Sequence, residues 1–306
     1  MANLKSILST STTDSLDYYS QGYAIYLKFS QHHQRCKDII QQEIPRVVSR
    51  ILPALSASQR LSILSIGAGD GKMDREVINA ALKALPEAFM IANTAVEPNA
   101  NELAVYKEAI ARAQAQYSLG NHRVEWRMEC QTFNTFLQRS SESTAFDLVH
   151  FIYSIYYMDD LEVALRQCYE RMLRDTGAIL VVLRTPEDLI SQLASCFASV
   201  GIQAAKGTED LRDTHVIEIA RKLGWVYERR ILPFTIDVTD LYDALSIDGN
   251  MLLDFLTHFV DFRKTAGPEL MRDVLQFIKD NSKINEGGRR EGRKEVAAVV
   301  IYKGIV

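Results

Sequence analysis

Cysteine is scarce in this sequence, and its placement excludes the uses that depend on clustered thiols. The 306 residues include six histidines and only four cysteines, which are Cys36, Cys130, Cys168 and Cys196. These cysteines lie far apart, form no Cys-x-x-Cys pair, and do not group with histidines at metal-ligand spacing. We therefore expect reduced thiols with structural roles and no metal site.

Long apolar runs and an excess of one charge are lacking as well. The chain has no stretch of about 18 apolar residues, the length that a membrane-spanning helix needs, and its N-terminus has no basic segment followed by an apolar one. Thirty-five basic and 39 acidic residues leave a net charge of -4, which creates no general attraction for DNA, RNA or an anionic membrane. We expect a cytoplasmic protein without nucleic-acid or membrane partners.

The remaining composition is that of an ordinary globular protein. Hydrophobic residues make up 47% of the chain and charged residues 24%, and 306 residues suffice for one large domain or two modest ones. We find no internal repeat, low-complexity tract or long linker, and we expect a monomer.

Apolar segments alternate with helix-like segments over the first two thirds of the chain. Helical spacing runs from residue 16 to about 43, with Pro45 as the expected stop. Five strands are then predicted, at 60–67, 88–98, 122–130, within 146–158 and at 177–185, with helices between them at 70–85, from 99 onward and at 160–173. This alternation predicts an α/β fold with a parallel sheet covered on both faces and ligands at the carboxyl ends of its strands.

The rhythm changes after Pro186. Two late strands are predicted within 223–241 and 295–304, and two helices of an inserted lobe lie between them at 247–262 and 268–282. The predicted division of the chain is an N-terminal helical cover at 1–50, a cofactor-binding core at 51–204, a substrate lobe at 205–292, and a final strand at 293–306.

A turn with three glycines follows the first predicted strand. In LSILSIGAGDGKMD (61–74), Gly67, Gly69 and Gly71 stand where the strand gives way to a helix. Glycine tolerates positive φ and lets a ligand come close, and the start of a helix offers free N–H groups. The pattern is neither the G-x-G-x-x-G of dinucleotide folds nor a P-loop. It therefore favours an adenosyl group over a phosphate.

An acidic residue, Glu97, ends the second predicted strand. A carboxylate at this place can accept hydrogen bonds from the two hydroxyls of a ribose. Two structural alternatives remain: the glycines could only shape a tight turn, and Glu97 could lie on the surface before Pro98. Because the two features sit on successive strands, we favour the functional interpretation.

Four stretches together resemble one enzyme family. ILSIGAGDG, AVEPNANELAVYKE, FDLVHFIYSIYYMDD and IDGNMLLDFLTHF lie in the order and at about the spacing of histamine N-methyltransferases, over nearly the whole chain. The resemblance implies a Rossmann-like class I methyltransferase fold, in which a seven-stranded, mostly parallel sheet ends in a reversed hairpin. It also implies a smaller substrate lobe and S-adenosylmethionine as the cofactor.

The resemblance further implies roles for single residues at the cofactor site. It places Gly67 beside the methionine part of the cofactor and Glu97 at the ribose. Glu102 stands where the family has a glutamine near the cofactor, Gln131 matches a small polar residue near the adenine, and Ile152 matches an apolar contact.

The acceptor pocket of the family is aromatic. Six positions match it here, and they are Tyr19, Tyr23, Tyr153, Tyr156, Tyr157 and Phe255. Tyrosine rings can hold a cationic or flat heteroaromatic ligand through their π-faces. Tyrosines at helical spacing can also be plain core residues, and this is the interpretation that we prefer for Tyr18 and Tyr26.

The chain departs from the family at two polar positions. A glutamate and an asparagine that contact histamine in the family correspond here to His32 and Glu295. His32 could instead be a solvated helical residue and Glu295 part of an exposed charged loop. If both face the pocket, we expect as the acceptor a small amine, an imidazole or a related nitrogen heterocycle, or histamine bound in another orientation.

Methyl transfer from a sulfonium depends mainly on alignment and on the exclusion of water. A proton acceptor is needed only for a protonated amine, and His32 or Glu295 could then serve, directly or through water. The expected function is thus S-adenosylmethionine-dependent N-methylation of a small molecule. The alternatives are a methyltransferase for an oxygen or peptide-amine acceptor, a catalytically silent cofactor-binding regulator and, more distantly, a nicotinamide dehydrogenase.

Overall fold

The apolar segments of the sequence become the buried strands of one sheet. The computed structural model describes residues 13–116, 123–140, 144–202 and 211–305. Its first five strands are β1 (Arg60–Ile66), β2 (Met90–Val96), β3 (Val124–Glu129), β4 (Phe146–Ile152) and β5 (Leu173–Arg184). Strands β1 and β4 are buried on both faces, as expected for strands inside a covered parallel sheet.

The sheet has the predicted class I arrangement. Its strand order is β3-β2-β1-β4-β5-β8-β6, with β6 at Val226–Asp237 and β8 at Arg290–Lys303. The pairs β1–β2, β1–β4, β2–β3 and β4–β5 are parallel. The seven predicted strands form this path, and the short β7 (Ser282–Ile284) adds an eighth by pairing antiparallel with β8. The strand order reverses between β1 and β4, which is where such sheets bind ligands.

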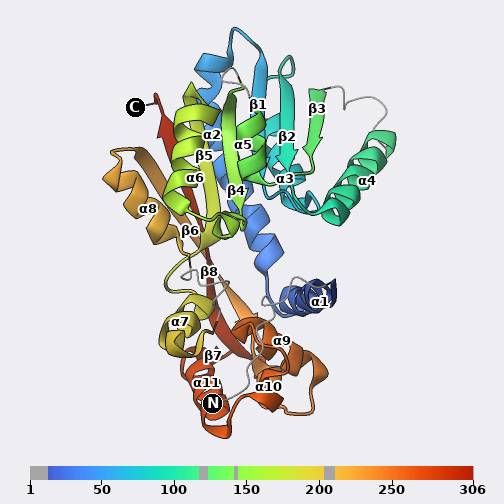
Figure 1. Cartoon of the computed structure of the whole chain (residues 1–306), viewed down its shortest axis with the longest axis vertical. Helices are drawn as coiled ribbons and strands as arrows, with labels where there is room; N and C mark the ends of the chain where they lie inside the picture. The colour runs from blue at the N-terminus through green and yellow to red at the C-terminus, as the bar shows by residue number, and fades with distance from the viewer. Residues whose placement is uncertain (1–12, 117–122, 141–143, 203–210, 306) are drawn as a thin grey trace. The chain divides into compact units, whose positions relative to one another are not determined.

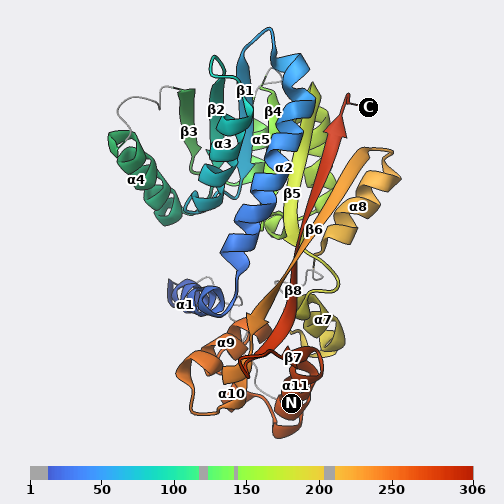
Figure 2. The same cartoon turned by 180° about the vertical axis from the view of Figure 1, so that it is seen from behind.

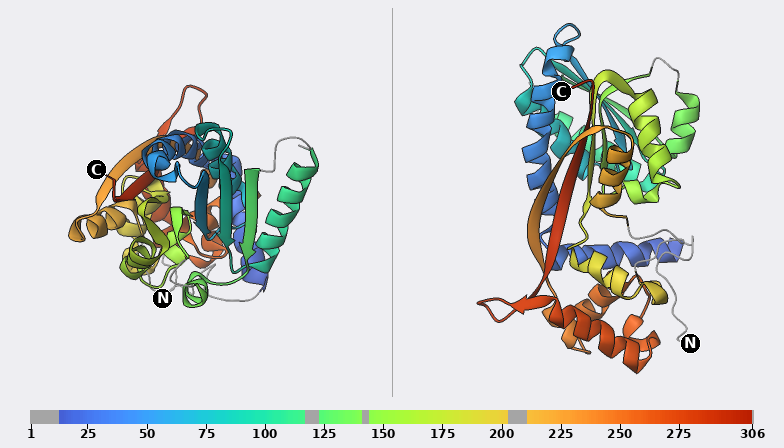
Figure 3. Two further views of the ribbon diagram at one scale, coloured as in Figure 1. Left: turned by 90° about the horizontal axis from the view of Figure 1, so that it is seen from above. Right: turned by 90° about the vertical axis from the view of Figure 1, so that its left-hand side faces the viewer.

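Helices cover both faces of this sheet. Figures 1 and 2 show α5 (Phe133–Arg139) and α6 (Leu161–Gln167) on one face, and α2 (His32–Leu55) and α3 (Lys72–Ala84) on the other. The edge-on view in Figure 3 shows the same layering. This part of the chain also contains two further helices, α4 (Ala100–Gln116) and α8 (Asp213–Lys222), and the π-helical turn η3 (Cys168–Met172).

The chain forms two units, and each has its own apolar core. The first, which we call the helical unit, comprises 1–35, 184–212 and 231–296, and the second, the sheet unit, comprises 36–183, 213–230 and 297–306. Side chains such as Leu64, Val149 and Ile179 form the core of the sheet unit. The predicted division at 50, 204 and 292 stays a prediction.

The described residues of the helical unit form five helices and two short 3-10 turns. The helices are α1 (Thr13–Phe29), α7 (Leu189–Cys196), α9 (Ile247–Thr257), α10 (Phe262–Thr265) and α11 (Pro268–Asp280), and the turns are η4 (Ala198–Val200) and η5 (Thr239–Tyr242). The buried carboxylate of Asp254 on α9 accepts hydrogen bonds from the backbone N–H groups of Asp261 and Phe262, each at 2.8 Å, and from the hydroxyl of Tyr18. Asp254 therefore ties α1, α9 and α10 together. No helix among the described residues combines the length and apolar character needed to cross a bilayer.

The prediction that Pro45 ends the N-terminal helix was wrong. Helix α2 continues through Pro45 and Pro53 to Leu55. Its apolar face is fully buried at Ile44, Val48 and Ile51. This packing stabilises the helix enough to offset the backbone hydrogen bond that a proline cannot donate.

Replacing Pro45 with alanine should therefore stabilise the protein. Pro45→Ala restores an N–H that can reach the carbonyl of Gln41 one turn earlier, and we expect a gain of about 1 kcal/mol and a rise in Tm of about 2 to 4 °C. Calorimetric unfolding measures this change, with Gln42→Ala at an exposed position of the same helix as the control. A lower Tm for Pro45→Ala would contradict the explanation.

Candidate functional site

The turn between β1 and α3 needs its glycines for backbone conformation. Gly67, Gly69 and Gly71 have φ values of 71°, 55° and 71°, in the region that side chains disfavour. A Cβ on Gly67 would lie 2.5 Å from the Cβ of Ser154, and one on Gly71 would lie 2.0 Å from the ring of Tyr106. A Cβ on Gly69 would meet no described atom within 4 Å. Packing thus closes two sides of the turn, while the backbone at Gly69 stays accessible.

Glu97 is joined to this turn by a hydrogen bond. One oxygen of its carboxylate accepts from the backbone N–H of Gly69 at 2.9 Å, and the other accepts from that of Asn99 at 2.8 Å. The residue is 8% exposed, so the alternative of a surface position is wrong. A carboxylate has roughly four acceptor sites, and two of them therefore remain for the hydroxyls of a ligand.

The other predicted cofactor residues lie at the carboxyl ends of neighbouring strands. Gln131 follows β3 and contacts Glu129 through its amide nitrogen at 3.0 Å, and Ile152 ends β4. Glu102 lies in the first turn of α4, where burial and the charges of Asp70 and Glu97 raise the pKa of its carboxyl group. Asn99 caps this helix, because its side-chain oxygen accepts a hydrogen bond from the backbone N–H of Asn101 at 3.0 Å.

The chain takes a strained path where β4 ends. Tyr153 has a φ of 52°, which is unusual for a residue with a side chain, and strained residues of this kind are enriched at functional sites. The hydroxyl of Ser154 donates to the carbonyl of Ile66 at 2.5 Å and so joins this segment to the end of β1. In the following turn η2 (Ile155–Tyr157), the rings of Tyr156 and Tyr157 pack edge to face at 4.9 Å, and Tyr157 is 62% exposed.

In the helical unit, the predicted aromatic residues gather around Phe255. Ring centroids lie 5.7 Å apart for Tyr19 and Phe255, 6.0 Å for Tyr23 and Phe255, and 6.5 Å for Tyr19 and Tyr23. We call these three side chains the aromatic cluster. Tyr26 stacks on Phe255 at 4.9 Å and is 4% exposed, so the prediction that it is a core residue is confirmed. Tyr18 is half-buried. Burial is the main cause that raises the pKa of its hydroxyl, and the hydrogen bond to Asp254 raises it further.

His32 is buried and is not the solvated residue that its helical position allowed. Its ring lies 5.4 Å from that of Tyr26 and 6.1 Å from that of Phe234. Burial, reinforced by the positive charge of Lys294, holds the pKa of His32 well below its usual value. The imidazole is therefore neutral at neutral pH.

Glu295 lies inside β8, and the alternative of an exposed loop is wrong. It is 3% exposed, and its carboxylate accepts from the hydroxyl of Thr185 at 2.6 Å and from Nε of Arg293 at 2.8 Å. Its backbone N–H donates to Asp188 at 3.1 Å. These bonds compensate the burial of charge in a stretch whose composition suggested solvent.

One further buried pair was not among the predicted site residues. Nζ of Lys294 lies 2.7 Å from the carboxylate of Asp188 and 5.4 Å from the ring centroid of Tyr26, and both charged residues are almost fully buried. One signal could have identified Asp188, namely its place shortly after strand β5, where ligands of such sheets gather.

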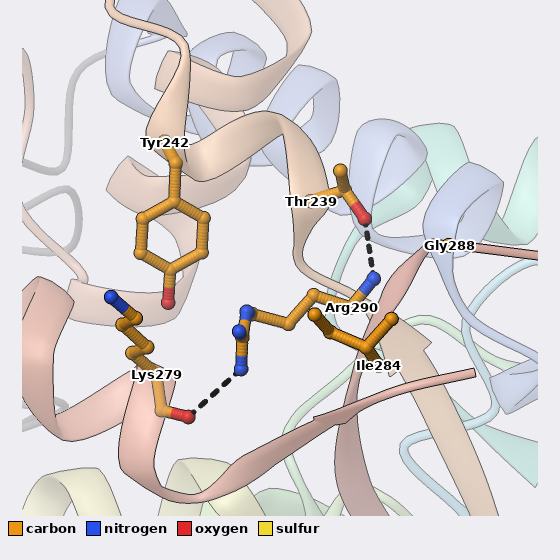
Figure 4. Close-up of a pocket in the computed structure, with 6 residues that line it drawn as sticks. All are labelled: Thr239, Tyr242, Lys279, Ile284, Gly288 and Arg290. Carbon is orange, nitrogen blue, oxygen red and sulfur yellow. Dashed lines mark hydrogen bonds between the residues drawn. The ribbon is translucent and has the colours of Figure 1, made fainter.

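A separate hollow of about 360 Å³ lies on the helical unit (Figure 4) and contains none of the predicted site residues. The backbone N–H of Arg290 donates to the hydroxyl of Thr239 at 2.7 Å, and its guanidinium donates to the carbonyl of Lys279 at 3.1 Å. The polar groups of Arg290 thus bind neighbouring segments of the protein. The side chains of Ile284 and Tyr242 form an exposed apolar wall of the hollow.

Comparison with known proteins identifies a family and several relatives. The family described as methyltransferase domain matches residues 32–231. A histamine N-methyltransferase of Bos taurus is 25% identical over 276 residues and covers 90% of each chain, and histamine N-methyltransferase B of Xenopus laevis is 28% identical, covering 91% of this chain and 90% of its own. A solved putative methyltransferase of Bacillus halodurans shares the fold with a TM-score of 0.50 at 16% identity, over 80% of this chain and 93% of its own. The predicted resemblance and fold class are confirmed.

Alanine at Gly71 should be far more damaging than alanine at Gly69. Both changes strain a positive φ, but only Gly71→Ala drives a Cβ into a ring, that of Tyr106. We expect Gly71→Ala to lose at least about 2 kcal/mol of stability and cofactor binding with it, and Gly69→Ala to lose about 1 kcal/mol. Chemical unfolding and calorimetric titration with the cofactor measure both effects. Equal losses for the two variants would contradict the packing argument.

Acid should destabilise the protein through His32. Because the pKa of His32 is lowered in the folded state, the unfolded chain binds a proton below about pH 6.5 that the folded chain does not. The contribution of His32 to the free energy of unfolding is therefore fully present above this pH and is lost as the pH drops. His32→Gln should reduce the slope by up to about 1.4 kcal/mol per pH unit, as measured by urea unfolding between about pH 5 and 7. His215→Gln on α8 is the control, and an unchanged slope for His32→Gln would count against the explanation.

Proposed function

The chain belongs to the methyltransferase-domain family and is an S-adenosylmethionine-dependent methyltransferase, and we propose that it methylates a nitrogen atom of a small amine or imidazole-type molecule. The observation that carries this proposal is the aromatic cluster of Tyr19, Tyr23 and Phe255 in the same unit as the neutral imidazole of His32. Flat nitrogen heterocycles stack on such rings. The names of the sequence relatives favour the same acceptor class.

We assign cofactor binding to the glycine turn and Glu97, with Glu102, Gln131 and Ile152 as further contacts. The open backbone at Gly69 and the two remaining acceptor sites of Glu97 fit an adenosyl group and its ribose. When bound, S-adenosylmethionine supplies an already activated methyl group. The task of the protein is then to hold the acceptor in line and to exclude water.

The surroundings of His32 and Glu295, the two candidate proton acceptors, favour one kind of nitrogen atom in the molecule to be methylated. The lowered pKa of His32 makes its imidazole a weak base, and both oxygens of the Glu295 carboxylate are engaged by Thr185 and Arg293. Neither side chain suits the removal of a proton from an aliphatic ammonium group. An unprotonated ring nitrogen of a neutral imidazole needs no such step. We therefore propose an imidazole-type ring nitrogen ahead of an aliphatic amine.

A screen of acceptors tests this function. The full chain is incubated with S-adenosylmethionine and, separately, with histamine, other imidazoles, aliphatic amines, phenols and a peptide, and the products are read by mass spectrometry. We expect methylation of the imidazoles. Methylation only of phenols or of the peptide would refute the proposal, as would calorimetric binding of the cofactor without turnover of any acceptor.

The aromatic cluster should act on the acceptor and not on the cofactor. Tyr23→Leu removes a π-face but keeps most of the bulk, so we expect KM for the acceptor to rise about five- to tenfold, equivalent to about 1 kcal/mol, with KM for S-adenosylmethionine unchanged. Tyr242→Leu, at a partly exposed tyrosine of the hollow in Figure 4, is the matched control. Equal effects of both variants, or an effect confined to the cofactor, would exclude the assigned role.

A further inference from the structure

A group of buried polar side chains lies beside the glycine turn and was not among the predicted site residues. It brings together five elements of the sheet unit, namely β1, β2, β4, α3 and α4. Its members are at most 2% exposed, and they are Ser65, Asp74, Asn93, Tyr106 and His150. Such a concentration of polar groups in a core needs compensating bonds, because an unpaired buried polar group is costly.

Asp74 is the centre of this group. The hydroxyl of Ser65 donates to one oxygen of its carboxylate at 2.6 Å, and the hydroxyl of Tyr106 donates to the other at 3.1 Å. Nε2 of His150 lies 3.8 Å from the first oxygen, beyond hydrogen-bond length. Burial lowers the pKa of His150, so the ring is neutral at neutral pH. Hydroxyl groups and the start of α3 therefore stabilise the carboxylate, rather than a cation.

Tyr106 contacts the turn as well as Asp74. Its ring fills the space beside Gly71, where a Cβ would approach it to 2.0 Å. Asp74 lies in the first turn of α3, the helix that begins directly after Gly71. The amide nitrogen of Asn93 on β2 reaches the same hydroxyl at 3.5 Å. One side chain of α4 thus contacts the last glycine of the turn through its ring and the following helix through its hydroxyl.

We propose that Asp74 and Tyr106 are positioning residues that fix the glycine turn in the conformation that binds S-adenosylmethionine. Three glycines within five residues make the free turn adaptable, and ordering it on binding would reduce affinity. The hydroxyl-to-carboxylate bond holds α3 against α4 before the cofactor arrives. This role depends on S-adenosylmethionine as the cofactor and not on the identity of the methyl acceptor.

Tyr106→Phe tests the proposal, because it keeps the ring against Gly71 and removes only the hydroxyl. We expect the Kd for S-adenosylmethionine and for S-adenosylhomocysteine to rise about five- to tenfold, the change that corresponds to about one net hydrogen bond. KM for any acceptor should stay the same. Asp74→Asn, which keeps the shape and removes the charge, should weaken binding in the same direction. Calorimetric titration of the full chain needs no acceptor, so it separates this proposal from the proposed function.

Asp147→Asn is the matched control. Asp147 is another buried carboxylate of the sheet unit, but it accepts from the backbone N–H of Ser62 at 2.7 Å and pairs with Arg174 at 3.1 Å, near the starts of β1 and β4 and away from the turn. The Asp147→Asn variant should have a lower Tm and an unchanged Kd for the cofactor. If Tyr106→Phe lowers Tm in the same way but changes Kd less than twofold, the hydroxyl is only structural and the proposal is wrong. If Tyr106→Phe leaves both quantities unchanged, the proposal is equally wrong.

Discussion

The hydrogen bond from the backbone N–H of Gly69 to the carboxylate of Glu97 is the contact on which the proposed cofactor site depends. It joins the turn after β1 to the end of β2 at 2.9 Å, while the second carboxylate oxygen caps the backbone at Asn99. A charged acceptor forms stronger hydrogen bonds than a neutral one, so a single side chain can set the separation of two loops. Contacts within the protein therefore fix the position of the turn after β1 relative to the end of β2.

Each unit places buried carboxylates beside the residues to which a function is assigned. In the sheet unit, Asp74 accepts from two hydroxyls. In the helical unit, Asp188 pairs with Lys294 and accepts from the backbone of Glu295. A carboxylate removed from water requires such partners, and their directions then restrict the elements that carry them. The buried carboxylates Asp74 and Asp188 thus orient the segments that they bind.

The proposed acceptor chemistry follows from the surroundings of His32 and Glu295, the two residues that the sequence resemblance matches to histamine contacts. A carboxylate facing a pocket would attract an ammonium group, whereas His32 is neutral and close to the charge of Lys294. The carboxylate at Glu295 is already engaged. In the helical unit, the aromatic faces of Tyr19, Tyr23 and Phe255 are the main recognition elements that we propose. The proposal therefore names a neutral heteroaromatic ring ahead of a charged amine.

The sequence by itself determined the features that depend on neighbouring residues. The alternation of strands and helices, the glycine turn, and the acidic end of β2 could be predicted because each is a local pattern repeated in a known order. Tertiary structure decided the rest. The extension of α2 through Pro45 depends on a buried face. The bonds of Asp74 with Tyr106, of Glu295 with Thr185 and of Lys294 with Asp188 join distant parts of the chain. Asp74 and Tyr106 are 32 residues apart, and Asp188 and Lys294 are 106 apart. No local pattern encodes such pairs, because the free energy that selects them arises only when folding removes both groups from water.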